Sequence, residues 1–325
     1  MKKLYHYTPL VILSVFTAIF ICLAQAAAFA ENVLLDTKIY KDAMDQREVS
    51  KAMYEELVKY FDSLSAATGI PVNVFTDPIK EEDLYAASFK MLDDSIKYIS
   101  DSQAPKPSNS YDFTALEKSI TDYIEKDAEE RSIEKDKEYR ELLDNTIKMA
   151  KVQVSSRLDT MMLFSFSDSS VAKTLHNHSG LITVAFWGFV GLAVLMIVIM
   201  VIIDRHHPRD LIYWAGLLMA VSAAVFLIPC VYLYKTEYFS SFFITNTYIH
   251  KTVTGMLELS LKKIILVQNI VLVIGLVLLV AAQVVHVLYK NYCKKQWKKT
   301  HWHKDVEQEP DAETPEADEA SGEEA

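Results

Sequence analysis

The chain has few cysteines, and their positions exclude a domain built on disulfides. Only Cys22, Cys230 and Cys293 occur in 325 residues, and none lies between residues 31 and 180, the long polar part of the chain. Eukaryotic secreted domains of this size often depend on disulfides, so their absence here favours a bacterial surface. Cysteine pairs at zinc-binding spacing are missing as well, which removes the common structural zinc sites.

The sequence also lacks the motifs of nucleotide-dependent enzymes. It contains no Walker loop, kinase signature or glycine-rich nucleotide turn. The acidic pairs Asp93-Asp94 and Glu129-Glu130 are typical of solvated helix faces, because acid–base catalysis needs two groups in one dry cleft. We expect no nucleic acid partner for this chain, whose net charge is −10. We therefore expect no enzyme activity, no cofactor and no bound metal.

What the chain does contain is four long apolar runs. Residues 181–203, 211–234 and 264–289 are each long enough to cross a bilayer, which takes about 20 apolar residues. Their length and composition predict three transmembrane helices. A fourth run, Pro9–Ala30, lies at the N-terminus behind two lysines.

The N-terminal run allows two interpretations. Its basic start, apolar centre and final Ala28-Phe29-Ala30 form the pattern of a signal peptide, which favours cleavage after Ala30. The run is also long enough to remain as a first transmembrane helix, or signal anchor. Residues 1–30 are thus a signal peptide or a first span, and either reading leaves Glu31 on the same side of the membrane.

Lysine and arginine near the spans predict the orientation, because they resist translocation. Ten of them flank the spans on the side of the N-terminus, residues 204–210 and the tail, against four in residues 235–263. We therefore expect a plasma-membrane protein with a cytoplasmic C-terminal tail. Residues 31–180 and the loop 235–263 are expected outside the cytoplasm.

Residues 31–180 are expected to form an all-α domain, a bundle of four amphipathic helices. Apolar residues recur at helical spacing over Val49–Leu64 and Ile133–Phe164. A second helix is expected to begin at Asp77-Pro78, and a third at Thr114 through a capping box. Val72–Phe75 alternates like a strand but is too short to matter. Matching apolar stripes predict a coiled-coil-like bundle that folds by itself.

The tail divides into two parts of opposite charge. Residues 290–304 are basic and aromatic, and suit the anionic lipids of the inner leaflet. Residues 305–325 carry ten acidic side chains and no basic one, so we expect a disordered tail. The candidate lipid-facing residues of the basic segment are Lys290, Lys294, Lys295, Lys298, Lys299, Trp297 and Trp302.

Polar and small residues within the spans are candidates for contacts between helices. Gln283 and His286 share one face of the last span, and polar groups in spans are functional candidates. We expect them to pack between helices, with a proton or solute path as the alternative. Gly216, Ala220 and Ala224 recur every four residues, a spacing that lets helices approach closely.

The segment Tyr60–Phe75, with its Gly69-Ile-Pro71 junction, and the segment Lys118–Ile124 resemble uncharacterised multi-pass membrane proteins of Firmicutes. The resemblance implies the same layout: an N-terminal hydrophobic segment, an extracytoplasmic helical domain and three spans. It implies no particular activity.

These patterns favour a non-enzymatic multi-pass membrane protein. Its outside domain is expected to bind a partner or ligand, and its spans to anchor or assemble a complex with a protein partner or as a homo-oligomer. A small transporter or channel subunit that uses Gln283 and His286 is the alternative. A membrane-embedded hydrolase is the third reading.

Overall fold

The computed structural model describes residues 2–203 and 208–306, and the side chains of residues 8–203 and 211–292. Among these residues every regular element is helical, which confirms the predicted all-α class. The elements are α1 (Lys2–Phe29), the π-helical turn η1 (Ala30–Leu34), α2 (Thr37–Gln46), α3 (Val49–Thr68), α4 (Val72–Thr76), α5 (Glu81–Ser100), α6 (Thr114–Glu130), α7 (Lys137–Leu158), α8 (Leu163–Ser167), α9 (Ser170–Asn177), α10 (Leu181–Ile203), α11 (Pro208–Lys235), the 3₁₀ turn η2 (Tyr238–Ser241) and α12 (Thr247–Val306).

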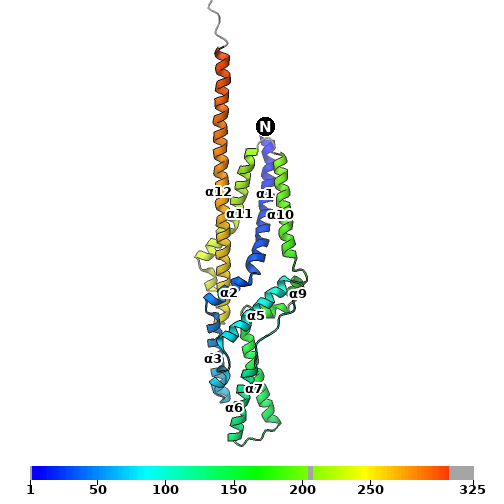
Figure 1. Ribbon diagram of the computed structural model, residues 1–325, viewed down its shortest axis with the longest axis vertical. Helices are drawn as coiled ribbons and strands as arrows, with labels where there is room; N and C mark the ends of the chain where they lie inside the picture. The colour runs from blue at the N-terminus through cyan, green and yellow to red at the C-terminus, as the bar shows by residue number, and fades with distance from the viewer. Residues whose placement is uncertain (1, 204–207, 307–325) are drawn as a thin grey trace, which may run out of the picture.

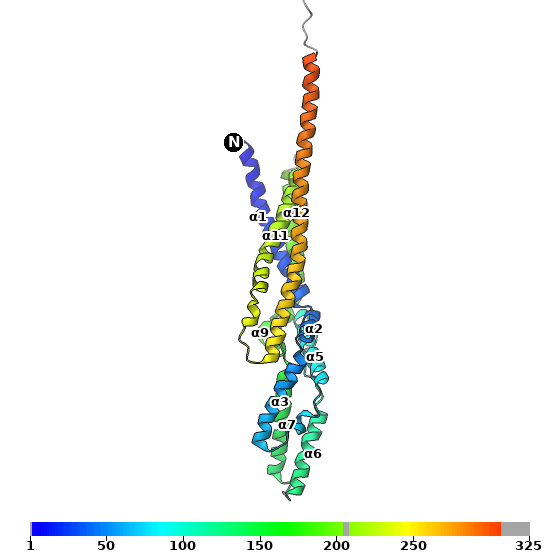
Figure 2. The same ribbon diagram turned by 90° about the vertical axis from the view of Figure 1, so that its left-hand side faces the viewer.

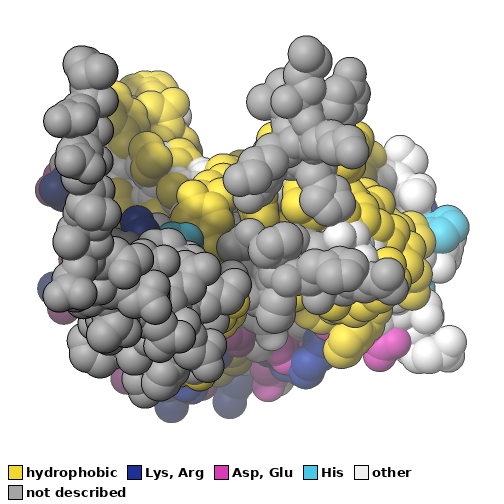
Figure 3. All heavy atoms as spheres, turned by 90° about the horizontal axis from the view of Figure 1, so that it is seen from above, with side chains coloured by type: hydrophobic (Ala, Val, Ile, Leu, Met, Phe, Trp, Pro, Cys, Tyr) yellow, Lys and Arg dark blue, Asp and Glu magenta, His cyan; other side chains and the backbone are white. Residues whose placement is uncertain are grey.

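The molecule is elongated, with two regions stacked along its long axis. The long helices α1, α10, α11 and α12 lie together at one end, and the shorter helices α2 to α9 form a helical domain at the other (Figure 1, Figure 2). Seen from the end of the long helices, hydrophobic side chains cover most of the described surface (Figure 3). This division by polarity is the one expected of a protein that is partly embedded in a bilayer.

Four described helices are long and apolar enough to cross a membrane. They include residues 8–34, 181–203, 211–235 and 247–292. The three spans predicted from the sequence are among them, and the N-terminal run is a helix of the same kind. The 23 residues of α10 alone extend about 35 Å, more than the hydrocarbon thickness of a typical bilayer.

The long helices associate as two pairs. α1 packs along α10, where the buried Thr17 hydroxyl contacts the sulfur of Met200 at 3.9 Å. α11 packs along α12, where a Cβ added to Gly216 would lie 2.9 Å from the carbonyl oxygen of Gly275. Phe29 of α1 meets Phe226 of α11 edge to face, which joins the pairs.

The core of the helical domain is formed by the stripes predicted for α3, α5, α6 and α7. Phe61 of α3 stacks on Phe75 of α4 with ring centroids 4.8 Å apart, and both are fully buried. Other fully buried side chains are Met53, Leu57, Leu84, Leu116, Ile120 and Leu158. Val72–Phe75 lies in the helical turn α4 rather than in a strand-like segment, and α4 takes part in this core.

The structure differs from the sequence expectation within residues 235–263. These residues were expected as a loop, yet α12 begins at Thr247 and continues without a break into the predicted span. Its first turns bury Tyr248, Thr252 and Met256, which are spaced by four residues and therefore share one face. Tyr248 and Met256 belong to the core of the helical domain, which thus includes part of α12.

Helix boundaries in the domain also differ from the expected ones. α2 was not expected, although Ile39, Tyr40, Ala43 and Met44 form its buried stripe. α5 begins at Glu81 rather than at Asp77-Pro78, which form a turn between α4 and α5. Thr114 is the first residue of α6 and does not cap it; its hydroxyl donates to Asp112 instead.

Candidate functional site in a cleft between α11 and α12

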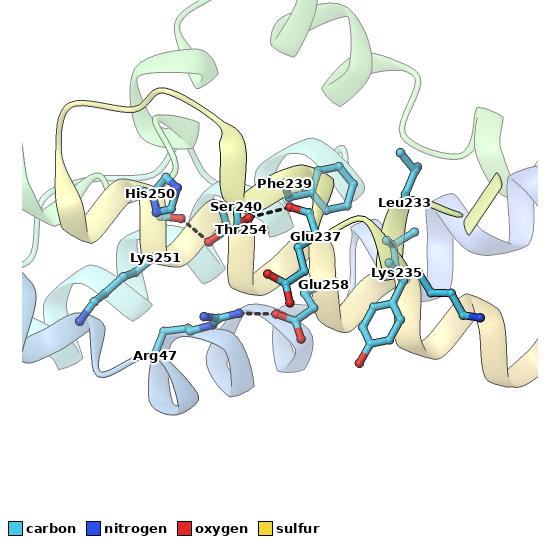
Figure 4. Close-up of a pocket in the computed structure, with 12 residues that line it drawn as sticks. Arg47, Leu233, Lys235, Glu237, Phe239, Ser240, His250, Lys251, Thr254 and Glu258 are labelled. Atoms are coloured by element: carbon cyan, nitrogen blue, oxygen red, sulfur yellow. Dashed lines mark hydrogen bonds and ion pairs between the residues drawn. The ribbon is translucent and has the colours of Figure 1, made fainter. Parts of the chain in front are cut away.

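A cleft of about 520 Å³ lies where the end of α11 meets the outer part of α12. Leu233, Tyr234 and Lys235 line it from the last turn of α11, and Glu237, Phe239 and Ser240 from η2 and the residue before it. His250, Lys251, Thr254, Glu258 and Leu261 line it from α12, and Arg47 from the residue after α2. Figure 4 shows these side chains converging on the cleft from α11, η2, α12 and the end of α2.

An ion-pair network forms the floor of the cleft. Arg47 pairs with Glu258 (Figure 4). Lys262 donates to the other oxygen of the same carboxylate at 2.8 Å. The Lys262 ammonium also lies 5.6 Å from the ring centre of Tyr234. One carboxylate is thus shared by two cations, which leaves positive charge in excess at this point.

Two further lysines line the cleft without a carboxylate partner among the described residues. Lys251 lies at one end and Lys235 at the other (Figure 4). Glu237 lies between them on an exposed left-handed residue, with φ of 48°. The lining therefore contains three lysine or arginine side chains and two carboxylates, and one of the carboxylates already pairs with two cations.

An aromatic wall borders the cleft on the side of η2. The rings of Tyr238, Phe239 and Phe242 meet edge to face, with centroids 5.5 to 5.8 Å apart. Phe243 follows and is 97% exposed. This wall comes directly after the apolar part of α11, so it lies at the boundary between the long apolar helices and the helical domain.

The opposite side of the cleft is held by contacts between α2 and α12. A Cβ added to Gly255 would lie 3.0 Å from Cγ of Arg47, so α12 passes close to the end of α2. Lys263 donates to the Asn32 carbonyl oxygen at 2.7 Å and pairs with Asp36 at 3.0 Å. Although burial opposes ionisation, Lys263 and the backbone N–H of Lys38 lower the pKa of the Asp36 carboxyl. These contacts fix the part of α12 that lines the cleft.

The side chains that line the cleft can hold a ligand through charge and apolar contact. Within the described residues no group of three or more His, Cys, Asp or Glu side chains is placed to hold a metal ion. His250 is the one imidazole that lines the cleft, and no cysteine or aspartate stands in its lining. Cations, aromatic rings and apolar side chains together suit an amphiphilic anion.

The structure places the predicted intramembrane pair on the outside of α12. Gln283 and His286 are both exposed, as is Lys290 after them. The other members of the basic cluster, Lys294, Lys295, Trp297, Lys298, Lys299 and Trp302, lie in α12, but their side chains fall outside the described ones. Residues 204–207 of the predicted turn and residues 307–325 of the acidic tail also lie outside the described residues.

A different glutamine pair lies between the spans. Gln268 is fully buried in α12, and its amide nitrogen donates to Oε1 of Gln25 in α1 at 3.3 Å. The second polar atom of the Gln268 amide, Oε1, has no hydrogen-bond partner among the described residues. Nothing in the sequence separates Gln268 from Gln283, because the choice between them depends on which face of α12 meets α1.

The cleft itself was not recognised from the sequence. In the sequence, Lys235 and Lys251 serve only to predict the orientation of the spans from the charge balance. The available signal was the aromatic run Tyr238–Phe243 beside a span end, since aromatic residues gather at membrane interfaces.

Comparisons of the chain with protein-family models, curated proteins and solved structures find no match. The resemblance to Firmicutes membrane proteins therefore remains a hypothesis, and the candidate function has to be argued from the geometry alone.

Proposed function

We propose that this chain is a non-enzymatic membrane protein whose helical domain binds a protein partner outside the cytoplasm while the long helices anchor the complex. The observation that carries the proposal is the shared use of α12. Its first turns belong to the core of the helical domain, and its later turns form a candidate span. With 60 residues, α12 extends about 90 Å.

A second feature supports binding by the helical domain. Helix α7 exposes Leu142, Met149 and Val152 to 61, 44 and 55%. Their spacing places them along one side of the helix, away from the buried stripe of Ala150 and Val154. Exposed apolar side chains gathered on one face mark contact surfaces more often than isolated ones do. The partner is a second protein or a second copy of this chain.

Site-specific photo-crosslinking in cells tests the proposal. A photoreactive residue at Leu142 or Val152 should give a crosslinked product, because the apolar stripe faces the partner. The same residue at Asp144, which is exposed elsewhere on α7, is the matched control. A product at twice the 37.0 kDa chain mass would identify a second copy, and any other mass a different partner.

Equal crosslinking from Leu142, Val152 and Asp144, or none from any of them, would contradict a specific partner on α7. The transporter alternative makes a different demand: replacing Gln283 and His286 by leucine should abolish activity while the protein still inserts. Their exposure on α12 gives that alternative no enclosed path within one described chain.

A further inference from the structure

We propose that the cleft between α11 and α12 binds the phosphate of an anionic phospholipid headgroup, from the leaflet that adjoins the helical domain. This inference goes beyond the proposed function, because it concerns a small ligand and a different surface from α7. It shares with that function the premise that α11 and α12 cross the membrane.

The position of the cleft is the first step of the argument. Leu233, Tyr234 and Lys235 belong to the last turn of a candidate span and line the cleft directly. Lipid headgroups occupy the layer just outside the hydrocarbon core. A cleft at the end of a span therefore opens at headgroup depth, where phosphate groups are the commonest anions.

The aromatic wall supports the same depth. Phe243 is 97% exposed and Tyr238 is 50% exposed, beside the packed rings of Phe239 and Phe242. Large apolar side chains presented together to water are unfavourable, whereas aromatic rings are enriched at the membrane interface. Because the wall continues the apolar surface of α11, lipid accounts for its exposure more directly than a separate partner does.

The charge of the lining selects an anion. Glu258 is held by both Arg47 and Lys262, so it competes weakly for a further cation. Lys235 and Lys251 have no carboxylate partner among the described residues, and they bracket the cleft from its two ends (Figure 4). Arg47 lies between them, and its guanidinium has five N–H donors to share between Glu258 and a ligand.

The size and apolar lining of the cleft select an amphiphile. A volume of about 520 Å³ falls within the range of small-molecule sites, about 300–1,000 Å³. Leu233, Phe239 and Leu261 supply apolar contacts beside the cations. A phosphate joined to glycerol and acyl chains matches this combination, with the phosphate toward the lysines and the chains toward α11.

The test uses the full-length protein in lipid nanodiscs. One preparation contains phosphatidylcholine alone, and another contains phosphatidylcholine with a minor fraction of phosphatidylglycerol. Native mass spectrometry then counts the phosphatidylglycerol molecules that the released protein retains. The variant Lys235→Gln/Lys251→Gln should bind the lipid about thirtyfold more weakly, since it removes two lysines that each contribute roughly 1 kcal/mol near the surface.

Matched variants separate the cleft from general charge effects. Lys118→Gln/Lys148→Gln removes the same charge from exposed positions of α6 and α7, and should retain lipid like the unchanged protein. Lys235→Arg/Lys251→Arg keeps the charge and should retain lipid too, which also guards against misfolding of the glutamine variant. Residues 290–304 are unchanged in every variant, so any contribution they make to lipid retention is the same in each. Equal retention by the two glutamine variants would overturn the proposal.

A soluble probe separates the two sources of phosphate. Glycerol phosphate is added to protein in the nanodiscs that contain phosphatidylglycerol, and is expected not to displace the retained phosphatidylglycerol. Displacement by it would assign the cleft to a soluble phosphate compound and overturn the lipid source. The shared premise is tested separately: a cysteine at Ser108 should react with an impermeant thiol reagent in intact cells. Absence of that labelling would contradict the membrane topology itself.

Discussion

At the scale of single residues, glycine decides how closely α11 and α12 approach. A Cβ at Gly275 would lie 2.8 Å from the backbone nitrogen of Ala220 and 3.0 Å from the carbonyl oxygen of Gly216. Both neighbours are backbone atoms, so no side chain can move aside. The sequence predicts this contact from the spacing of Gly216 and Ala220, but it does not reveal Gly275 as the partner, because pairing depends on the register of two helices.

Gly275→Ala should therefore separate the two helices and destabilise the protein. Overpacking of a close contact costs about 1–3 kcal/mol, which predicts a melting temperature several degrees lower in detergent. Gly188→Ala in α10 is the matched control, since a Cβ there meets nothing within 4 Å. Equal melting temperatures for the two variants would show that the α11–α12 contact is looser than the structure has it.

Buried and exposed polar residues of α12 show what sequence alone cannot resolve. Gln268 and Gln283 are both glutamines within one apolar run, and only Gln268 is buried. The expectation that Gln283 and His286 pack between helices rests on their shared face. The structure turns that face outward, so within one chain the polar contact belongs to Gln25 and Gln268 instead.

At the scale of elements, α12 connects the two regions of the molecule. Glu56 of α3 accepts the backbone N–H of Thr247 at 2.6 Å, which places a carboxylate at the first turn of α12. A negative group there is favourable because helix N-termini carry partial positive charge. Ile249 and Met256 then pack into the domain core, so a fragment of residues 31–170 would lack part of its own core.

A peptide of residues 244–264 should stabilise that fragment. We expect residues 31–170 to be helical alone, with a low and broad melting transition. Added peptide should raise the melting temperature by burying Tyr248, Ile249 and Met256. At a hundred times its Kd, a ligand contributes about 2.7 kcal/mol to the free energy of unfolding. Circular dichroism at increasing peptide concentration measures the shift.

A peptide carrying Gly255→Leu provides the control. Its larger side chain would meet Arg47 and Ala43 where α12 crosses the end of α2. No rise should then follow at the same concentration. If the fragment alone melts cooperatively at a temperature that neither peptide changes, α12 is dispensable for the domain, as the sequence first indicated.

The sequence predicts the presence of the longer helices better than the residues at which helices begin and end. The stripes of α3 and α7 are readable because their apolar residues recur over five or more turns. α2 was missed since its ten residues offer fewer than three turns of pattern. The start of α12 was missed for another reason. Its polar residues Lys251, Glu258 and Lys262 resemble a loop in composition, although their spacing of seven and four residues places them on one side of a continuous helix.

The cleft could not be predicted because its residues come from distant parts of the chain. Arg47 and Glu258 are separated by more than 200 positions and meet only because α12 returns to pack on α2. No local pattern encodes that return. The sequence does indicate that basic residues and aromatic rings stand next to the end of a span.

At the scale of the whole molecule, the N-terminal helix behaves as part of the assembly. α1 packs along α10 and also reaches α11. Gln25 supplies the described partner of the buried Gln268 amide nitrogen, and Phe29 packs on Phe226. Cleavage after Ala30 would remove all of these contacts. The signal-peptide pattern and the packing thus favour opposite outcomes for residues 1–30.

We predict that residues 1–30 stay attached. Release of α1 would remove the hydrogen bond between Gln25 and Gln268 and the packing of α1 along α10, so the attached form is the more stable one. Intact-protein mass spectrometry of the full-length protein, expressed with a C-terminal tag, measures the outcome. The variant Ala30→Phe blocks an Ala-x-Ala cleavage site. The unchanged protein and this variant should differ in mass only by that one substitution. A protein that is lighter than this variant by residues 1–30 would show that the helix is a signal peptide, and that its packing against α10 exists only before processing.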